Sequence, residues 1–285
     1  MADLTAIILT KNEEKNIGEC IRSIQPVASR VVVVDSGSED RTVEIAQELG
    51  AEILVHPFEN YSRQFIYGME HANIQTKWVL RIDADEQLTE ESATELQEIL
   101  EANDHTDVNG VVIRFEVIFM GKQLRHGGIY PFRKLLVFRY GKGFMEERNM
   151  DEHITLTEGR IVELKHDSKH KDYKDLTYWI HKHNWYSSRE VLDYIAAQGG
   201  NRENGEALEK EASFKRFVKF HIYYKLPMGM RSYLYYFYRY YLKGGFLDGK
   251  EGKIFAFLQA YWYRFLVDAK IYEWQKQSET KDEIE

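Results

Sequence analysis

Over the first hundred residues, short runs of aliphatic residues alternate with segments in which apolar residues recur at helical spacing. The aliphatic runs predict strands over residues 4–9, 30–34, 51–55 and 77–82. The periodic segments predict a helix after each strand: after Asn12, over 40–49, over 61–73 and after Thr89. Because side-chain oxygens favour helix starts, we expect Asn12, Ser38 and Thr89 to be N-caps. This alternation predicts an α/β domain, a mostly parallel, Rossmann-like sheet with helices on both faces.

The pattern changes after about residue 109. Shorter strands are predicted over residues 110–119, 134–139, 154–157 and 160–164, and from about residue 172 the chain is predicted to be helical to its end. We therefore expect two parts that pack together: an α/β domain over residues 1–170 and a helical C-terminal region over residues 171–285.

Composition narrows the class of protein. With 44% hydrophobic and 29% charged residues, the 285-residue chain can form a globular core. The single cysteine, Cys20, excludes an intrachain disulfide and suits a reducing compartment. Residues 1–5 lack the features of a signal peptide, and no run approaches the roughly 18 apolar residues of a membrane-spanning helix. The net charge of −8 argues against a general nucleic-acid binder, so we expect a cytoplasmic protein that does not bind nucleic acid.

Short polar side chains follow three of the predicted strands. They lie in the segments Thr10-Lys11-Asn12-Glu13, Asp35-Ser36-Gly37-Ser38-Glu39-Asp40 and Asp83-Ala84-Asp85. Ligands of open parallel sheets bind beyond the carboxyl ends of the strands. Two aspartates spaced i, i+2 where a strand ends can converge on one hard cation, which is usually shared with substrate phosphate oxygens. The pattern thus suggests a metal-bridged phosphate ester; the alternative is two unrelated surface aspartates.

The order and spacing of these three segments resemble the family 2 glycosyltransferases of the GT-A fold, over roughly residues 4–102. The resemblance implies a nucleotide-sugar donor, most often linked to UDP, and a divalent Mg or Mn ion. It also implies that Asp35 accepts a hydrogen bond from the base and that Thr10 and Glu13 line the nucleoside pocket. Arg63 falls where the family often has an arginine near the base, although Gln64 replaces the commoner asparagine.

The same resemblance implies roles around the diphosphate. Asp85 would ligate the metal, and Asp83 would contact the metal, its bound waters or the ribose. An inverting transferase needs a general base for the acceptor hydroxyl, and the family places it in a short acidic motif, here Met150-Asp151-Glu152-His153. Asp151 and Glu152 are both candidates for the base. His153 is a candidate third metal ligand, or it orients a carboxylate.

Two further segments resemble bacterial family 2 enzymes that build lipopolysaccharide core or similar envelope glycans. They are Arg125-His126-Gly127-Gly128-Ile129-Tyr130-Pro131, followed by Arg133, and the later Gly245-Phe246-Leu247-Asp248-Gly249. On this resemblance His126, Tyr130 and Arg133 are candidate acceptor contacts. The alternative for Gly127-Gly128 is an ordinary turn. The cluster His181-Lys182-His183-Asn184 fits acceptor contact or packing better than metal binding, because no acid or cysteine completes a ligand set.

Residues 213–250 are basic and aromatic. They contain eight lysines and arginines, one acid and thirteen phenylalanines and tyrosines, which gives a charge of +7 and leaves −15 for the rest of the chain. Phe214, Phe217, Val218, His221 and Ile222 fall on one helical face, with cations away from it. This predicts docking on an anionic membrane surface, at the inner face of the cell membrane. The alternative is a helix packed on the α/β domain.

Together these observations predict an inverting, metal-dependent glycosyltransferase that moves a sugar from a nucleotide-sugar to a glycan or lipid-linked acceptor. One rival is a metal-dependent phosphohydrolase with Asp83 as nucleophile and Asp85 as its acid partner. Such enzymes carry the pair after the first strand, whereas here it follows the fourth, and Gln87 stands where they have Thr or Val. A second rival is a non-catalytic membrane-associated adaptor that retains the fold.

Overall fold

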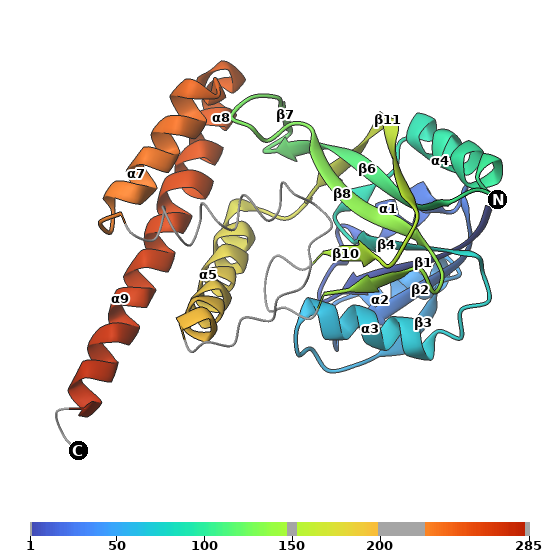
Figure 1. The fold of residues 1–285 in the computed structure, drawn as a ribbon, viewed down its shortest axis with the longest axis horizontal. Coiled ribbons are helices and arrows are strands. Elements are labelled where there is room, and N and C mark those ends of the chain that lie inside the picture. The colour runs from blue at the N-terminus through green and yellow to red at the C-terminus, as the bar shows by residue number, and fades with distance from the viewer. Residues whose placement is uncertain (1, 147–152, 199–225, 283–285) are drawn as a thin grey trace. The chain divides into compact units, whose positions relative to one another are not determined.

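Four parallel strands in the order β3–β2–β1–β4 form one half of a nine-stranded sheet in the computed structural model, which describes residues 2–146, 153–198 and 226–282 (Figure 1). The order continues β8–β6–β11–β5, and β7 pairs with β6. The strands are β1 (Ala2–Thr10), β2 (Ala28–Asp35), β3 (Glu52–Val55), β4 (Trp78–Asp83), β5 (Glu86–Gln87), β6 (Val108–Phe119), β7 (Lys122–Leu124), β8 (Phe132–Arg139) and β11 (Arg160–Lys171).

The second half of the sheet is mixed. Strand β8 runs antiparallel to both β4 and β6, and β11 runs parallel to β6. A separate antiparallel pair joins β9 (Gly143–Met145) to β10 (Ile154–Leu156). Strand β11 continues to Lys171, past the predicted end at residue 164, because its polar second half still pairs with β6 and then with β5. The predicted parallel order therefore holds for the N-terminal half, while the whole sheet is mixed.

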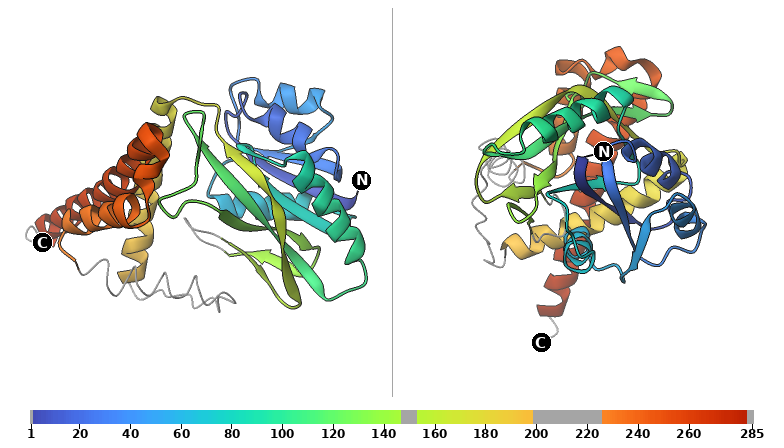
Figure 2. Two further views of the ribbon diagram at one scale, coloured as in Figure 1. Left: turned by 90° about the horizontal axis from the view of Figure 1, so that it is seen from above. Right: turned by 90° about the vertical axis from the view of Figure 1, so that its right-hand side faces the viewer.

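Helices cover both faces of this sheet, as predicted (Figure 2). Alternate residues of a strand point to opposite faces, so Leu4 and Ile8 of β1 pack in one core and Ile7 and Leu9 in the other. The first core includes α1 (Ile17–Ile24), α2 (Thr42–Glu48) and α4 (Glu90–Ala102); the second includes α3 (Tyr61–His71). Burial on both faces explains why the β1 and β2 sequences are nearly continuous apolar runs.

One of the three predicted N-caps is confirmed. Thr89 accepts a hydrogen bond from the Ser92 backbone N–H, and the Ser92 side chain accepts one from the Thr89 backbone N–H. The predictions for Asn12 and Ser38 were wrong, because these side chains connect two loops instead: Asn12 Oδ1 accepts from Glu39 N, and Ser38 Oγ accepts from Asn12 N, each at 2.8 Å. Asn12 and Ser38 thus connect the loops after β1 and β2 and do not cap the helices that follow them.

The chain divides into two compact units. The first comprises Met1–Gln123 and Tyr130–Lys174, and the second comprises Leu124–Ile129 and Asp175–Glu285. The short segment Leu124–Ile129 therefore belongs to the C-terminal unit, although the sequence-based division between residues 170 and 171 leaves it in the α/β domain. Among the described residues, none of the helices combines the length and apolar character needed to cross a bilayer.

The second unit is helical (Figure 1). Its elements are α5 (Leu176–Gln198), α7 (Met230–Phe237), a π-helical continuation (Tyr238–Leu242), a 3-10 turn (Gly245–Asp248), α8 (Gly249–Ala256), a second π-helical segment (Phe257–Trp262) and α9 (Tyr263–Asp282). Val191 of α5 packs with Tyr263, Val267 and Ile271 of α9 in a small core. The buried Glu190 carboxylate accepts hydrogen bonds from Tyr263 Oη and Arg264 Nη1, each at 2.8 Å. This polar contact fixes the register of the two helices.

His183 of α5 lies in an aromatic cluster of this unit. Its ring stacks on Trp179 at 3.5 Å between centroids and meets Tyr263 edge-on. Burial lowers the pKa of His183 to about 4, against a smaller opposing effect of its hydrogen bond to the Trp179 carbonyl. The neutral imidazole thus serves in packing, one of the two roles expected for this cluster.

We expect the helical unit to lose stability as the pH falls from about 6.5 to about 4. In that range the unfolded chain binds a proton at His183 that the folded chain does not, so unfolding is favoured by up to about 3 kcal/mol. A His183→Phe variant keeps a stacked ring and should show a flatter dependence of its unfolding free energy on pH. His181→Phe, on the exposed side of the same helix, is the control, and equal slopes for wild type and His183→Phe would contradict the assignment.

Candidate active site

The carboxyl ends of three parallel strands meet at one edge of the sheet. In the strand register, Thr10 lies opposite Asp35 on one side of β1, and Leu9 lies opposite Asp83 on the other. The three predicted polar segments therefore start side by side, although 25 and 48 residues separate Asp35 from Thr10 and from Asp83. This edge is where open α/β sheets bind ligands.

Asp35 organises the loop that follows β2. Its carboxylate is buried and accepts from Gly37 N and Ser38 N on one oxygen, and from Thr10 Oγ1 and Ser38 Oγ on the other. Gly37 has φ +79°, a conformation that favours glycine. Four donors occupy the roughly four acceptor positions of a carboxylate, so a base could bind Asp35 only by replacing one donor, and the rotatable Ser38 hydroxyl is the easiest to displace.

Glu13 lies in the loop that follows β1. Its Oε1 is 2.6 Å from Lys174 Nζ, and its Oε2 accepts from Asn16 Nδ2 at 2.7 Å. Burial raises the pKa of Glu13; Lys174 opposes this effect, while the negative charge of Asp85 adds to it. The negative charges of Glu13 and Asp85 are therefore close enough to repel one another.

Arg63 and Gln64 lie in the first turn of α3. Arg63 is exposed, and its backbone N–H donates to the capping Asn60 Oδ1. Gln64 is buried, and its Nε2 donates to Ser36 Oγ at 2.8 Å and to the His56 carbonyl. The glutamine that departs from the family pattern therefore connects α3 to the loop that follows Asp35.

Asp83 is held by cations. Lys134 Nζ donates to Asp83 Oδ2 at 3.0 Å and to the fully buried Glu86 at 2.6 Å, and Arg81 lies 3.4 Å from the other Asp83 oxygen. Burial acts to lower the pKa of Lys134, but the carboxylates of Asp83 and Glu86 together outweigh it and raise the pKa. Lys134 therefore stays charged and compensates part of the negative charge gathered at this edge.

Asp85 is buried beside an imidazole that the sequence analysis missed. His170 of β11 pairs with Glu86 of β5, and its Nε2 lies 3.9 Å from Asp85 Oδ2. That distance exceeds a hydrogen bond but is shorter than two metal–ligand bonds of about 2.1 Å placed end to end, so one divalent ion can touch both atoms. The sequence analysis missed His170 because it predicted this strand to end at residue 164, six residues before His170, whereas β11 continues to Lys171.

The structure shows hydrogen bonds for three of the remaining predicted residues, His153, Tyr130 and Arg133. His153 is exposed just before β10, and its carbonyl accepts from Glu146 N. Tyr130 Oη donates to Asp167 at 2.6 Å, which raises the pKa of Tyr130, and Arg133 Nε donates to Glu163 at 2.8 Å. Asp151 and Glu152 lie outside the described residues, so their role as general base stays a prediction.

His126 belongs to the helical unit, where it contacts Asp248 of the segment Gly245-Phe246-Leu247-Asp248-Gly249. Asp248 is buried; its Oδ2 accepts from the backbone N–H groups of Arg125 and His126, and its Oδ1 lies 2.8 Å from His126 Nδ1. Arg239 donates to the Gly127 carbonyl, and Gly127 N donates to the Lys243 carbonyl. The Gly127-Gly128 segment is thus a turn held in a defined position, with the His126 ring oriented by Asp248.

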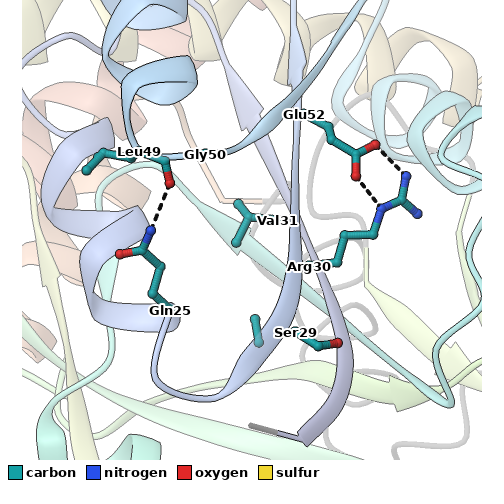
Figure 3. Close-up of a pocket in the computed structure, with 8 residues that line it drawn as sticks. Gln25, Ser29, Arg30, Val31, Leu49, Gly50 and Glu52 are labelled. Carbon is teal, nitrogen blue, oxygen red and sulfur yellow. Dashed lines mark hydrogen bonds and ion pairs between the residues drawn. The ribbon is translucent and has the colours of Figure 1, made fainter.

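A shallow pocket lies at the opposite end of the strands. Gln25, Ser29, Leu49 and the Arg30–Glu52 ion pair line it, at the amino ends of β2 and β3 (Figure 3). Among the described residues, no group of three or more His, Cys, Asp or Glu side chains is arranged to hold a metal ion. We therefore place the candidate site at the carboxyl edge, where substrate oxygens and water would complete the coordination of any ion.

Residues 5–157, more than half of the chain, match the family model described as glycosyl transferase family 2. The chain belongs to this family. The mixed sheet with helices on both faces is its GT-A fold, and the protein is a glycosyltransferase, which argues against the phosphohydrolase and adaptor alternatives.

Curated relatives agree with this family. The glycosyltransferase is 29% identical over 205 residues to an uncharacterised glycosyltransferase from Rickettsia typhi, covering 68% of this chain and 69% of that protein. It is 27% identical over 284 residues to the lipopolysaccharide core biosynthesis glycosyltransferase LpsC from Rhizobium meliloti, covering 95% and 92%.

Among solved structures, glucosyl-3-phosphoglycerate synthase from Mycobacterium tuberculosis, in complex with Mn2+, UDP and glucosyl-3-phosphoglycerate, is 20% identical with a TM-score of 0.32. The overlap covers 40% of this chain and 43% of that one. It thus spans less than half of either protein.

We expect Lys134→Met to lower the free energy of unfolding by about 2–4 kcal/mol. The change leaves Glu86 and Asp83 without their main cation, and breaking a buried pair costs about 3–5 kcal/mol when both partners are fully buried, whereas Lys134 is 23% exposed. Lys142→Met removes one partner of the exposed pair with Glu158 and should cost less than about 1 kcal/mol. Chemical denaturation measures both, and equal losses would contradict the proposed charge compensation.

Proposed function

We propose that this glycosyltransferase moves a sugar from a UDP-sugar to a hydroxyl of a cell-envelope glycan or a lipid-linked acceptor, with inversion at the anomeric carbon. The observation that carries the proposal is the parallel register that brings Thr10, Asp35 and the Asp83–Asp85 segment to one edge of the sheet. The likeness to LpsC over nearly the whole chain supports an envelope glycan as the acceptor class.

The donor would bind along this edge. The nucleoside would lie between Thr10, Asp35, Glu13 and Arg63. The base would donate a hydrogen bond to Asp35 after the Ser38 hydroxyl rotates away. Asp83, which Lys134 holds, suits a hydrogen bond to the ribose or to metal-bound water better than direct metal ligation, because its Oδ2 already accepts from a charged lysine. The diphosphate would lie beside Asp85.

A divalent ion, Mg or Mn, fits Asp85 and His170. Carboxylate and imidazole groups both ligate such ions, and the 3.9 Å between Asp85 Oδ2 and His170 Nε2 permits a shared ion. We prefer His170 to His153 as the imidazole ligand because its position beside Asp85 is fixed by the pairing of β5 with β11. When bound, the ion would neutralise the charge that develops on the diphosphate leaving group.

Direct displacement of the diphosphate needs one general base, which takes the proton of the acceptor hydroxyl. The acceptor oxygen forms a bond to the anomeric carbon as the bond from that carbon to the diphosphate oxygen breaks, and the acceptor proton passes to Asp151 or Glu152. The candidate acceptor contacts are Tyr130, Arg133 and His126. Asp248 orients the ring of His126. A lipid-linked acceptor would place the enzyme at the inner face of the cell membrane.

Asp85→Ala should abolish sugar transfer while leaving the fold intact, because it removes the carboxylate nearest the proposed ion. We expect wild type to be stabilised by one of a panel of UDP-, GDP- and dTDP-sugars with Mn, by about 3 kcal/mol at a hundredfold excess over Kd, and Asp85→Ala to lose this shift. The exposed Asp107→Ala, which breaks only a surface pair with Arg160, is the control. Transfer by Asp85→Ala at the wild-type rate would overturn the mechanism.

Asp151→Asn and Glu152→Gln should separate the two candidate bases. The variant that lacks the base should lose about 10²–10⁴-fold in kcat, the usual contribution of general base catalysis. It should still bind the donor with Mn, because the base acts on the acceptor. The other variant should keep most of its kcat. Two variants with near wild-type kcat would exclude this acidic motif as the base.

A further inference from the structure

The continuous helix formed by α7 and the following π-helical segment exposes bulky apolar side chains along one face. The exposed residues recur every three or four positions and therefore share that face. They are Met230, Tyr233, Leu234, Phe237, Tyr238, Tyr241 and Leu242, each between 40% and 68% exposed. We refer to these seven residues as the apolar stripe. An exposed apolar surface of this kind is typical of an interaction site.

Polar contacts on the opposite face fix the rotation of this helix. Arg231 is buried and lies 2.6 Å from Asp268 of α9, and Ser232 donates to the same carboxylate at 3.2 Å. Further along, Arg239 donates to Tyr235 Oη and to the Gly127 carbonyl. Turning the stripe inward would break a buried ion pair, so the apolar side chains stay outward.

The surface that follows the stripe is apolar and cationic. Phe246 and Leu247 of the 3-10 turn are 48% and 59% exposed, and the exposed lysines Lys243, Lys250 and Lys253 lie before and after them in the chain. Of the two acids in this stretch, Asp248 is buried against His126 and Glu251 is half-buried. The exposed charge here is therefore mostly positive, on a chain whose net charge is −8.

We propose that the apolar stripe together with Phe246, Leu247 and the three lysines docks on the anionic surface of a lipid bilayer. The apolar and tyrosine side chains would enter the boundary between headgroups and acyl chains, and the lysines would contact anionic headgroups. This surface refines the segment 213–250 expected from the sequence, of which residues 213–225 lie outside the described residues.

The lysines favour a membrane over other occupants of the stripe. A twofold dimer through this face would bring the same lysines of two copies together, whereas anionic lipids complement them. Tyrosine is also enriched where one end of a side chain is apolar and the other is hydrated, as at a membrane interface. The docking rests on the proposed function only because a lipid-linked acceptor would be reached at the membrane surface.

Sedimentation of the full-length protein with vesicles tests the docking without donor or acceptor. We expect binding to vesicles of phosphatidylcholine mixed with phosphatidylglycerol, little binding to phosphatidylcholine alone, and release at high salt. Leu242→Glu/Leu247→Glu should weaken binding at least about tenfold, because two large apolar contacts are lost. Lys243→Gln/Lys250→Gln/Lys253→Gln should reduce the dependence on phosphatidylglycerol.

Leu192→Glu is the matched control, since Leu192 is 56% exposed on α5 of the same unit and should not affect binding. Wild type that binds no vesicles, or a Leu242→Glu/Leu247→Glu variant that binds like wild type, would overturn the docking. If wild type forms dimers that Leu242→Glu/Leu247→Glu dissociates, the stripe is instead an interface with a second copy. If that variant has a lower Tm, the stripe packs within the chain. Unchanged vesicle binding by Asp85→Ala separates failure of the proposed catalysis from failure of the docking.

Discussion

The register of β1 between β2 and β4 is the constraint on which the candidate site depends. Three parallel strands that end together bring Thr10, Asp35 and Asp83 to one edge of the sheet, from segments far apart in sequence. A shift by one residue would turn Asp35 and its neighbours to the opposite face. The two apolar cores, one on each face, oppose that shift because a slipped strand would place its side chains in the wrong core, where they would not fit the close packing.

Once the register collects carboxylates at one edge, their repulsion has to be compensated. The structure supplies cations from later parts of the chain: Lys134 between Asp83 and Glu86, and Lys174 at Glu13. His170 adds an imidazole that can ligate metal beside Asp85. The antiparallel β8 and the long β11 therefore do more than extend the sheet. They carry the groups that balance and complete the proposed donor site.

In the helical unit, buried polar contacts fix the orientation of the helices and so determine which side chains are exposed to solvent. Glu190 fixes α5 to α9, and the Arg231–Asp268 pair fixes the rotation of α7. The loop with His126 joins this unit through Asp248, so two motifs more than a hundred residues apart form one cluster. In both units, a few buried charges determine the orientation of elements whose apolar faces alone would allow several arrangements.

The sequence by itself determined the parallel half of the fold, the family and the Asp83–Asp85 segment, because strand and helix periodicity and strand-end motifs are local properties. It also identified the Thr89 cap, which depends only on residues within one helical turn. The roles of Asn12 and Ser38 were decided by a neighbouring loop, and the compensating Lys134 and the imidazole of His170 by β8 and β11. Only the tertiary structure could decide these, because each depends on residues brought together by strand pairing and not by proximity in the chain.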